Sequence, residues 1–190
     1  MKTLYVNAAV RSGSRTAELA REVLGHLGGD VTEIRPHECG FPVADEGFLA
    51  KRDKACAAGN LSGEMFSAAR QFAQADTIVI AAPFWDLSFP AALKQYFEQI
   101  NVVGLTFTYR DGRPVSLCRA KRLFYVTTAG GRIFSAEYGF GYVRALAESF
   151  YGIGECVMFS AERLDEYGFD ADAAMEQAKH EIGVYFSRQG

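Results

Sequence analysis

The feature that most limits how this chain can fold is the regular alternation of two kinds of apolar segment. One kind is short and rich in Val, Ile, Leu, Phe and Tyr, which is typical of strands buried on both faces of a sheet. The other kind places apolar residues three or four positions apart, as in a helix with one buried face. The alternation predicts an α/β fold with a doubly wound, five-stranded parallel sheet and helices on both faces. The predicted strands lie within 2–10, 30–36, 76–83, 121–131 and 154–164, and the predicted helices within 16–27, 62–76, 90–101, 135–152 and 170–189.

Two segments depart from this alternation within what we predict to be a single domain over 1–190. The segment 37–60 mixes proline, glycine and charged residues, and we expect an irregular excursion over one face of the domain. The segment 105–117 places apolar residues on both sides of Asp111-Gly112, which predicts an inserted β-hairpin. Ser62 is the predicted N-cap of the helix after the excursion, and Pro90 suits the first turn of the next helix.

Composition and charge exclude several classes of protein. A formal net charge of -3 provides no basic field for nucleic acid or an anionic membrane, so neither is an expected partner. No apolar run is long enough to cross a bilayer and the start does not resemble a signal peptide, which predicts a cytoplasmic protein. The cysteines and histidines are scattered without metal-ligand spacing, so we expect thiols and no metal site.

Ligands of doubly wound sheets bind beyond the carboxyl ends of the strands, where the strand order reverses. The loops after the predicted strands are therefore the segments to search for a site. Three of them are informative, namely RSGSRT (11–16), PFWDLSF (83–89) and TTAGGR (127–132). The loops after the second and fifth strands offer little.

The first loop predicts a site for a terminal phosphate. It matches neither GxxxxGK[ST] nor GxGxxG, which disfavours nucleoside triphosphatases and Rossmann dinucleotide enzymes. It does combine hydroxyls, guanidinium groups and free N–H groups at a helix N-terminus, which suit an anion. The alternative is a simple helix cap with surface arginines. The candidate residues are Arg11, Ser12, Ser14, Arg15 and Thr16.

The second loop is unusually aromatic for a segment that faces water, and it holds the only tryptophan of the chain. Its rings could line a flat ligand, or they could pack under the domain as a separate hydrophobic cluster. Asp86 is its single charge, and the alternative role for it is a helix cap or a brace for the loop. The candidate residues are Pro83, Phe84, Trp85, Asp86 and Leu87.

The third loop offers backbone amides and close approach to a ligand, or else only a tight turn into a helix. Its candidate residues are Thr128, Ala129, Gly130 and Gly131. Together the three loops predict a mononucleotide with a large planar ring, and FMN fits best. The sequence shows no Ser-His-Asp order, no paired carboxylates and no cysteine after a strand, so a cofactor would carry the chemistry.

Four motifs occur in order along nearly the whole chain: NAAVRSGSRTAELA, APFWDLSFPAALKQYFEQI, GLTFTYRDGRPVSL and YVTTAGG. In combination they resemble the flavodoxin-like, FMN-dependent NAD(P)H:quinone oxidoreductases and azoreductases. The resemblance implies a flavodoxin-like domain in which NADH or NADPH delivers a hydride to bound FMN and leaves. A quinone or azo compound would then take its place and accept two electrons, in a ping-pong reaction.

The resemblance also implies a homodimer with each active site at the subunit interface. The segment 96–100 and the hairpin are candidates for that interface, with ordinary core packing as the alternative. Tyr109 and Tyr138 are candidate proton donors, although both could equally be structural. Azoreductases usually have asparagine where this chain has Asp86 and a serine where it has Ala8, which leaves the substrate open. The alternatives are a flavodoxin-type electron carrier and a binding module without flavin.

Overall fold

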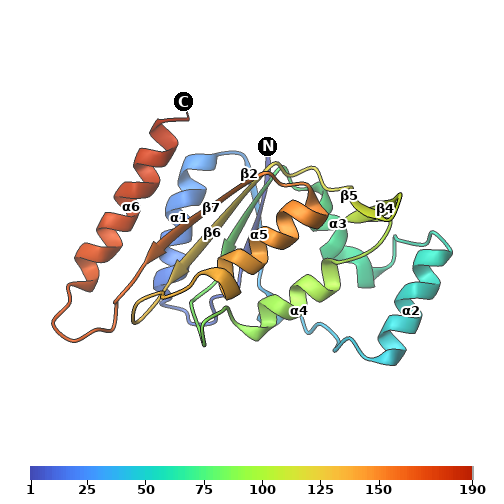
Figure 1. Ribbon diagram of the computed structural model, residues 1–190, viewed down its shortest axis with the longest axis horizontal. Helices are drawn as coiled ribbons and strands as arrows, with labels where there is room; N and C mark the ends of the chain where they lie inside the picture. Colours follow the sequence, from blue (N-terminus) through green and yellow to red (C-terminus); the bar gives the residue numbers. More distant parts are fainter. Residues whose placement is uncertain (190) are drawn as a thin grey trace.

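The computed structural model describes residues 1–189, and its central feature is a parallel sheet of five strands (Figure 1). The strand order is β2-β1-β3-β6-β7, and every neighbouring pair is parallel. The chain passes outward from β1 to β2 and then crosses to the other side for β3, so the order reverses between β1 and β3. The predicted doubly wound sheet is confirmed. The strands are β1 (Lys2–Asn7), β2 (Asp30–Ile34), β3 (Thr77–Ala81), β6 (Arg122–Thr128) and β7 (Glu155–Ala161).

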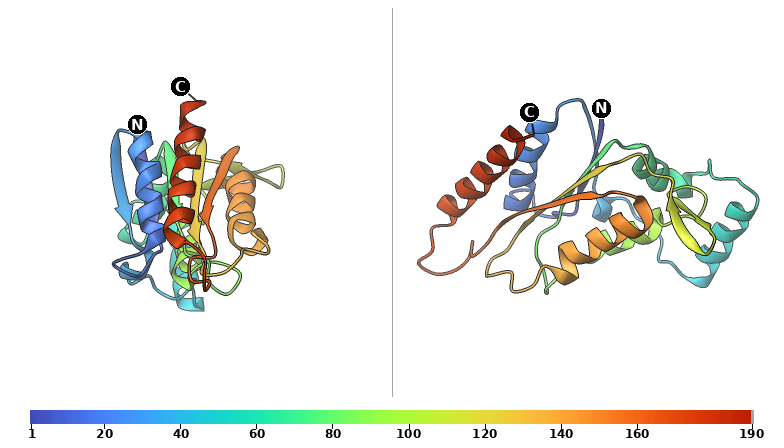
Figure 2. Two further views of the ribbon diagram at one scale, coloured as in Figure 1. Left: turned by 90° about the vertical axis from the view of Figure 1, so that its left-hand side faces the viewer. Right: turned by 45° about the horizontal axis from the view of Figure 1, so that its top comes forward.

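Helices cover both faces of this sheet, as the alternation of segments predicts. The helices α1 (Arg15–Leu27) and α6 (Ala171–Ser187) lie side by side on one face, where Leu19 and Ile182 are fully buried (Figure 2). The other face carries α3 (Ser67–Gln74), α4 (Ala91–Ile100) and α5 (Tyr142–Leu146). β3 lies between the two apolar layers, and each of its residues is buried. None of the helices over residues 1–189 is long and apolar enough to cross a membrane.

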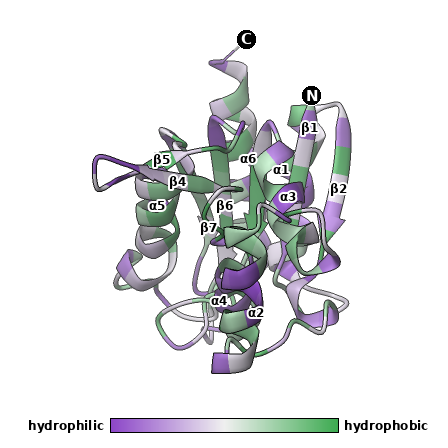
Figure 3. Ribbon diagram, turned by 90° about the vertical axis from the view of Figure 1, so that its right-hand side faces the viewer, coloured by the Kyte–Doolittle hydropathy of each residue, from purple (hydrophilic) through white to green (hydrophobic). Residues whose placement is uncertain are grey.

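The predicted hairpin is present as β4 (Phe107–Arg110) and β5 (Arg113–Ser116). Asp111 and Gly112 have φ angles of 53° and 74°, the left-handed pair that a two-residue hairpin turn requires. Figure 3 shows that the hairpin projects beside α5 with a hydrophilic tip. Its base is held to the domain because the Ser116 hydroxyl donates to the Tyr151 carbonyl at 2.6 Å.

The segment 37–60 is more regular than the sequence predicts. It begins within a short 3-10 helix (Pro36–Glu38) and contains α2 (Glu46–Ala57), whose first turn is capped by the Asp45 carboxylate. No residue of α2 is fully buried, which explains why no clear apolar stripe is visible in its sequence. The preceding residues are attached to α4, since the Gln95 side chain donates to the carbonyl of Phe41 at 2.7 Å.

Two predicted helix starts are also wrong in detail. Ser62 donates to the side chain of Asn60 and caps no helix, because a 3-10 turn (Glu64–Phe66) precedes α3. Pro90 is the N-cap residue of α4 and lies just before its first turn. The helix predicted within 135–152 is irregular at both ends, since π-helical turns (Glu137–Gly141 and Ala147–Tyr151) flank α5 on both sides.

Candidate functional site

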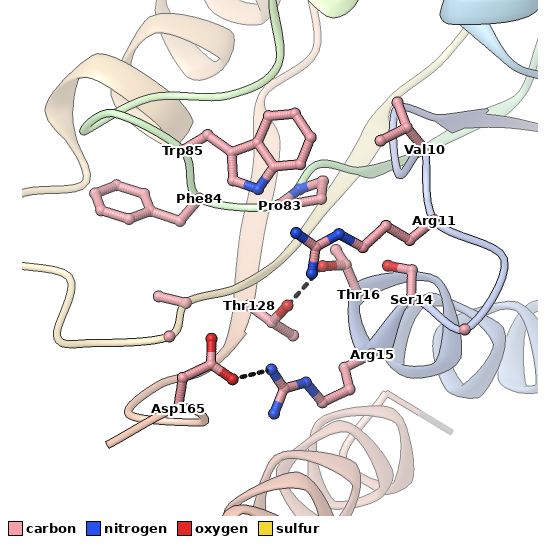
Figure 4. Close-up of a pocket in the computed structure, with 13 residues that line it drawn as sticks. Val10, Arg11, Ser14, Arg15, Thr16, Pro83, Phe84, Trp85, Thr128 and Asp165 are labelled. Carbon is pink, nitrogen blue, oxygen red and sulfur yellow. Dashed lines mark hydrogen bonds and ion pairs between the residues drawn. The ribbon is translucent and has the colours of Figure 1, made fainter. Parts of the chain in front are cut away.

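A pocket of about 370 Å³ opens at the carboxyl ends of β1, β3 and β6, at the reversal of strand order (Figure 4). All three informative loops contribute to it, so the topology brings them together as expected. Its walls are formed by Val10, Arg11, Gly13, Ser14, Arg15, Thr16, Pro83, Phe84, Trp85, Thr128, Ala129, Gly130 and Asp165. Ser12, Asp86, Leu87 and Gly131 belong to the same loops but do not line the pocket.

The loop after β1 presents hydrogen-bond donors to this pocket. Ser14 is the N-cap of α1, and its hydroxyl oxygen accepts from the N–H of Ala17 at 3.3 Å. The N–H groups of Arg15 and Thr16, the first two residues of α1, have no acceptor within residues 1–189. Such unpaired groups at the positive end of a helix favour an anion.

A pair of hydroxyls joins the first loop to the third. Thr16 Oγ1 and Thr128 Oγ1 are 2.6 Å apart, and the Thr16 side chain is buried. When one of the two hydroxyls donates to the other, the hydrogen of the second stays free for a ligand in the pocket. The two threonines therefore hold the walls together and can also contribute a donor.

The base of the first loop is braced by Asn7, the last residue of β1. Its side-chain oxygen accepts from the N–H of Ala9 at 3.1 Å, and its amide donates to Glu33 of β2 at 2.8 Å. This hydrogen bond is the main cause that lowers the pKa of Glu33, with a further contribution from the Arg35 side chain. The charged form of Glu33 thus supports the loop that carries the donors.

The loop after β3 places two rings on the pocket wall and turns sharply beyond them. Trp85 and Ser88 exchange backbone hydrogen bonds of 2.8 and 3.1 Å across a two-residue turn. Asp86 and Leu87 occupy the turn with φ angles of 50° and 67°. Asp and Asn tolerate this conformation far better than most residues, whereas a leucine there is strained. The turn therefore accounts for a residue of the Asp or Asn type at position 86.

The sequence missed the contribution of the loop after β7, and the prediction that it offers little is wrong. Asp165 lines the pocket, and its carboxylate lies 2.5 Å from the Arg15 guanidinium (Figure 4). The loop runs beside the one after β6, because the N–H groups of Leu164 and Asp165 donate to the carbonyls of Ala129 and Gly130. A sequence signal for this contribution is the expected pairing of the last two strands, because it brings the loop after β7 beside the loop after β6.

Gly130 is required by this arrangement for steric reasons. A Cβ atom at position 130 would lie 2.5 Å from Oδ2 of Asp165. The third loop can therefore lie against the loop after β7 without displacing the Asp165 carboxylate only when position 130 has no side chain.

Neither tyrosine proposed as a proton donor lines the pocket. Tyr109 lies on the hairpin, and Tyr138 lies in the π-helical turn before α5, where its carbonyl accepts from the Ser88 hydroxyl at 2.6 Å. Both side chains are exposed. Tyr96, Phe97 and Ile100 of α4 are buried in the core of the chain itself, so core packing accounts for most of the apolar side chains in 96–100.

The donors and the rings of the pocket fit an anionic group joined to a flat ring system. Unpaired N–H groups, the threonine hydroxyls and Arg11 lie on one side, and Trp85 lies on the opposite side (Figure 4). A family model, Flavodoxin_2, described as the flavodoxin-like fold, matches residues 1–186. The chain belongs to the Flavodoxin_2 family.

Several proteins of known name are similar to this Flavodoxin_2 member. An FMN-dependent NADH:quinone oxidoreductase of Clostridium beijerinckii is 41% identical over 112 residues, which cover 58% of this chain and 56% of that protein. The chain thus spans little more than half the length of that relative. A relative with the same name from a Jannaschia species is 31% identical over 185 residues, which cover 92% of this chain and 93% of the relative.

A solved structure shows the same fold as this Flavodoxin_2 chain. An azoreductase from Bacillus anthracis superimposes with a TM-score of 0.83 over 99% of both chains, at 22% sequence identity. The likeness extends over the hairpin and the segment that contains α2, because nearly the whole chain is covered. The predicted family and the predicted flavodoxin-like fold are both confirmed.

Proposed function

We propose that this protein is an FMN-dependent NAD(P)H:acceptor oxidoreductase that reduces quinones or azo compounds by two electrons. The observation that carries the proposal is the pocket at the strand-order reversal, which joins an anion site to an aromatic wall. The relatives named FMN-dependent NADH:quinone oxidoreductase support the same activity, and their name favours NADH as the donor.

In this proposal the loop after β1 holds the phosphate of FMN. The N–H groups of Arg15 and Thr16 and the hydroxyl of Ser14 would donate to it. Arg11 has no carboxylate partner within residues 1–189 and would supply the opposite charge. Ser12 belongs to the same loop but does not line the pocket, and its contact with the phosphate stays a prediction.

The ring of FMN would lie between the loops after β3 and β6. Phe84 and Trp85 would limit its position and exclude water from one side, while backbone groups near Ala129 and Gly130 would contact its polar edge. When bound, FMN supplies the chemistry of accepting a hydride from a nicotinamide and passing two electrons to an acceptor.

The chain's own residues would act mainly by position. The only carboxyl group among the residues that line the pocket is Asp165, which is engaged by Arg15. Histidine, cysteine and tyrosine are absent from that lining. A proton that the acceptor takes up would therefore come from water or from a group outside the pocket.

The proposal includes a single domain over 1–190, a cytoplasmic location and a homodimer. Four free cysteines support a reducing compartment. Exposed apolar side chains beside the pocket support a partner surface there. They are Trp85 and Leu87 in the loop after β3, Phe134 in the loop after β6 and Tyr138 in the π-helical turn before α5. Because most of the segment 96–100 is buried, the hairpin is the remaining candidate for the interface predicted from the sequence.

An anaerobic reduction experiment tests the proposed function. The purified protein is loaded with FMN, its absorption spectrum is recorded, and NADH or NADPH is added without oxygen. We expect the flavin absorption to bleach, and a quinone or an azo dye to restore it as the acceptor is reduced. Bound flavin that stays oxidised with both nicotinamides would contradict the reductase and leave an electron carrier. A protein that binds no FMN would contradict both.

A further inference from the structure

An ion pair crosses the rim of the pocket at the end that offers the anion donors. Arg15, the first residue of α1, reaches the loop after β7, where it donates to the Leu164 carbonyl at 2.8 Å and to the Asp165 carboxylate at 2.5 Å. The two charged partners are separated by 150 positions in the sequence. The contact, called here the rim pair (Arg15 and Asp165), thus links the start of α1 directly to the loop after β7.

The rim pair faces both the pocket and the solvent. Both residues line the pocket, yet the side chains of Arg15 and Asp165 remain 40% and 70% exposed. Exposed ion pairs add little to stability, so a contribution to folding does not explain this one. Figure 4 shows the pair on the side of the pocket away from Trp85, next to the start of α1.

The position of the Asp165 carboxylate is set from two further directions. The N–H of Asp165 donates to the carbonyl of Gly130 at 3.0 Å, which holds the backbone against the third loop. The absence of a side chain at Gly130 leaves the space that Oδ2 of the carboxylate occupies. A negative charge is therefore held at the rim of a pocket whose other polar groups favour anions.

We propose that the rim pair determines which flavin nucleotide the pocket accepts, by closing it behind a terminal monophosphate. This inference rests on the proposed function. FMN ends at one phosphate, which the donors at the start of α1 can bind without passing the rim. FAD carries a second phosphate and an adenosine, which would have to open the rim pair or lie against the Asp165 carboxylate. Asp165 thus acts as a specificity-determining residue that disfavours FAD.

Binding of the two flavins to the apoprotein tests this role without any turnover. Dissociation constants for FMN and for FAD freed of FMN are measured by flavin fluorescence in the wild type, Asp165→Ala and Asp165→Asn. We expect the wild type to prefer FMN. The selectivity ratio, which is the dissociation constant of FAD divided by that of FMN, should fall at least tenfold in Asp165→Ala. Asp165→Asn keeps the size of the side chain and removes its charge, so its ratio should fall by a smaller factor.

Glu166→Gln is the matched control. Glu166 forms an exposed ion pair with Arg163 at 2.7 Å in the same loop, but neither residue lines the pocket. We expect its ratio to equal that of the wild type. Circular dichroism checks the fold of each variant, and Asp165→Asn decides the matter if Asp165→Ala does not fold.

The outcomes separate this inference from the proposed function. A wild type that binds FMN and FAD equally well, or a ratio that stays unchanged in the Asp165 variants, overturns the role of the rim pair and leaves the oxidoreductase intact. A ratio that shifts as much in Glu166→Gln overturns it too, because the effect would then belong to the loop in general. A wild type that binds neither flavin contradicts both proposals.

Discussion

Replacing Thr16 by valine should weaken the binding of FMN without affecting riboflavin, which lacks the phosphate. The side chain is buried, and its hydroxyl lies 2.6 Å from that of Thr128. Valine has nearly the same shape, so the variant removes the hydrogen bond and one donor hydrogen with little change in packing. We expect the free energy of unfolding of the apoprotein to fall by about 1 kcal/mol, the net value of one such bond.

The effect on FMN should be larger than the effect on stability. A hydrogen bond to a charged group contributes about 1.5–3 kcal/mol, which corresponds to a roughly 10- to 150-fold higher dissociation constant. Quenching of flavin fluorescence measures both ligands on the same protein. Riboflavin should bind within about twofold of its wild-type affinity, because it makes no contact with the phosphate donors.

Thr127→Val is the matched control for this prediction. Thr127 is the neighbour of Thr128 on β6, and its hydroxyl is buried without a hydrogen-bond partner in the described chain. Its loss should leave FMN binding unchanged and keep or raise stability, since an unpaired buried hydroxyl is costly. Equal weakening of FMN and riboflavin in Thr16→Val would refute the reasoning, as would unchanged FMN binding.

Three further perturbations test other parts of the site. Gly130→Ala places a Cβ 2.5 Å from Asp165 Oδ2, so the exposed carboxylate should move and the rim pair should separate, with stability within about 0.5 kcal/mol of the wild type in chemical unfolding; an unchanged ratio of the FAD and FMN dissociation constants would contradict the tight approach. Leu87→Gly relieves a φ of 67° and should stabilise the apoprotein by up to about 1 kcal/mol, with FMN affinity unchanged because position 87 does not line the pocket. The pKa of Glu33 is lowered in the folded protein, first by the hydrogen bond from Asn7. Glu33 therefore contributes to the free energy of unfolding above its unfolded pKa of about 4.3, and this contribution is lost as pH falls through the folded pKa. Because Glu33 is partly exposed, that contribution should stay under about 1 kcal/mol; Glu33→Gln should flatten the acid limb of the stability curve, and an unaltered limb would speak against it.

Much of the fold follows from the sequence because its signals are local. The residues of β3 form an unbroken apolar run, and such a run is typical of a central parallel strand. The hairpin turn is predictable because Asp111 and Gly112 both readily adopt the positive φ angles that the turn requires. The three informative loops could be placed at one edge of the sheet because parallel strands all end there.

The remaining features depend on partners that are distant in sequence. The contact between Asp165 and Arg15 depends on the pairing of β7 with β6, and no residue near position 165 in the sequence indicates it. The helix α2 has no fully buried face, so its sequence lacks the apolar periodicity that indicates a helix. The sequence predicts ring contacts for Asp86 and Leu87, because it does not show that Trp85 and Ser88 close a two-residue turn around them.

The central claim is that the pocket beside Trp85 is the FMN site. Trp85 is the only tryptophan of the chain and lines that pocket, so its fluorescence reports directly on occupancy. The decisive measurement is a titration of the apoprotein with FMN while the tryptophan emission is followed. We expect strong quenching that saturates at one FMN per chain. Flavin that binds without changing this emission would show that the FMN site does not lie beside Trp85.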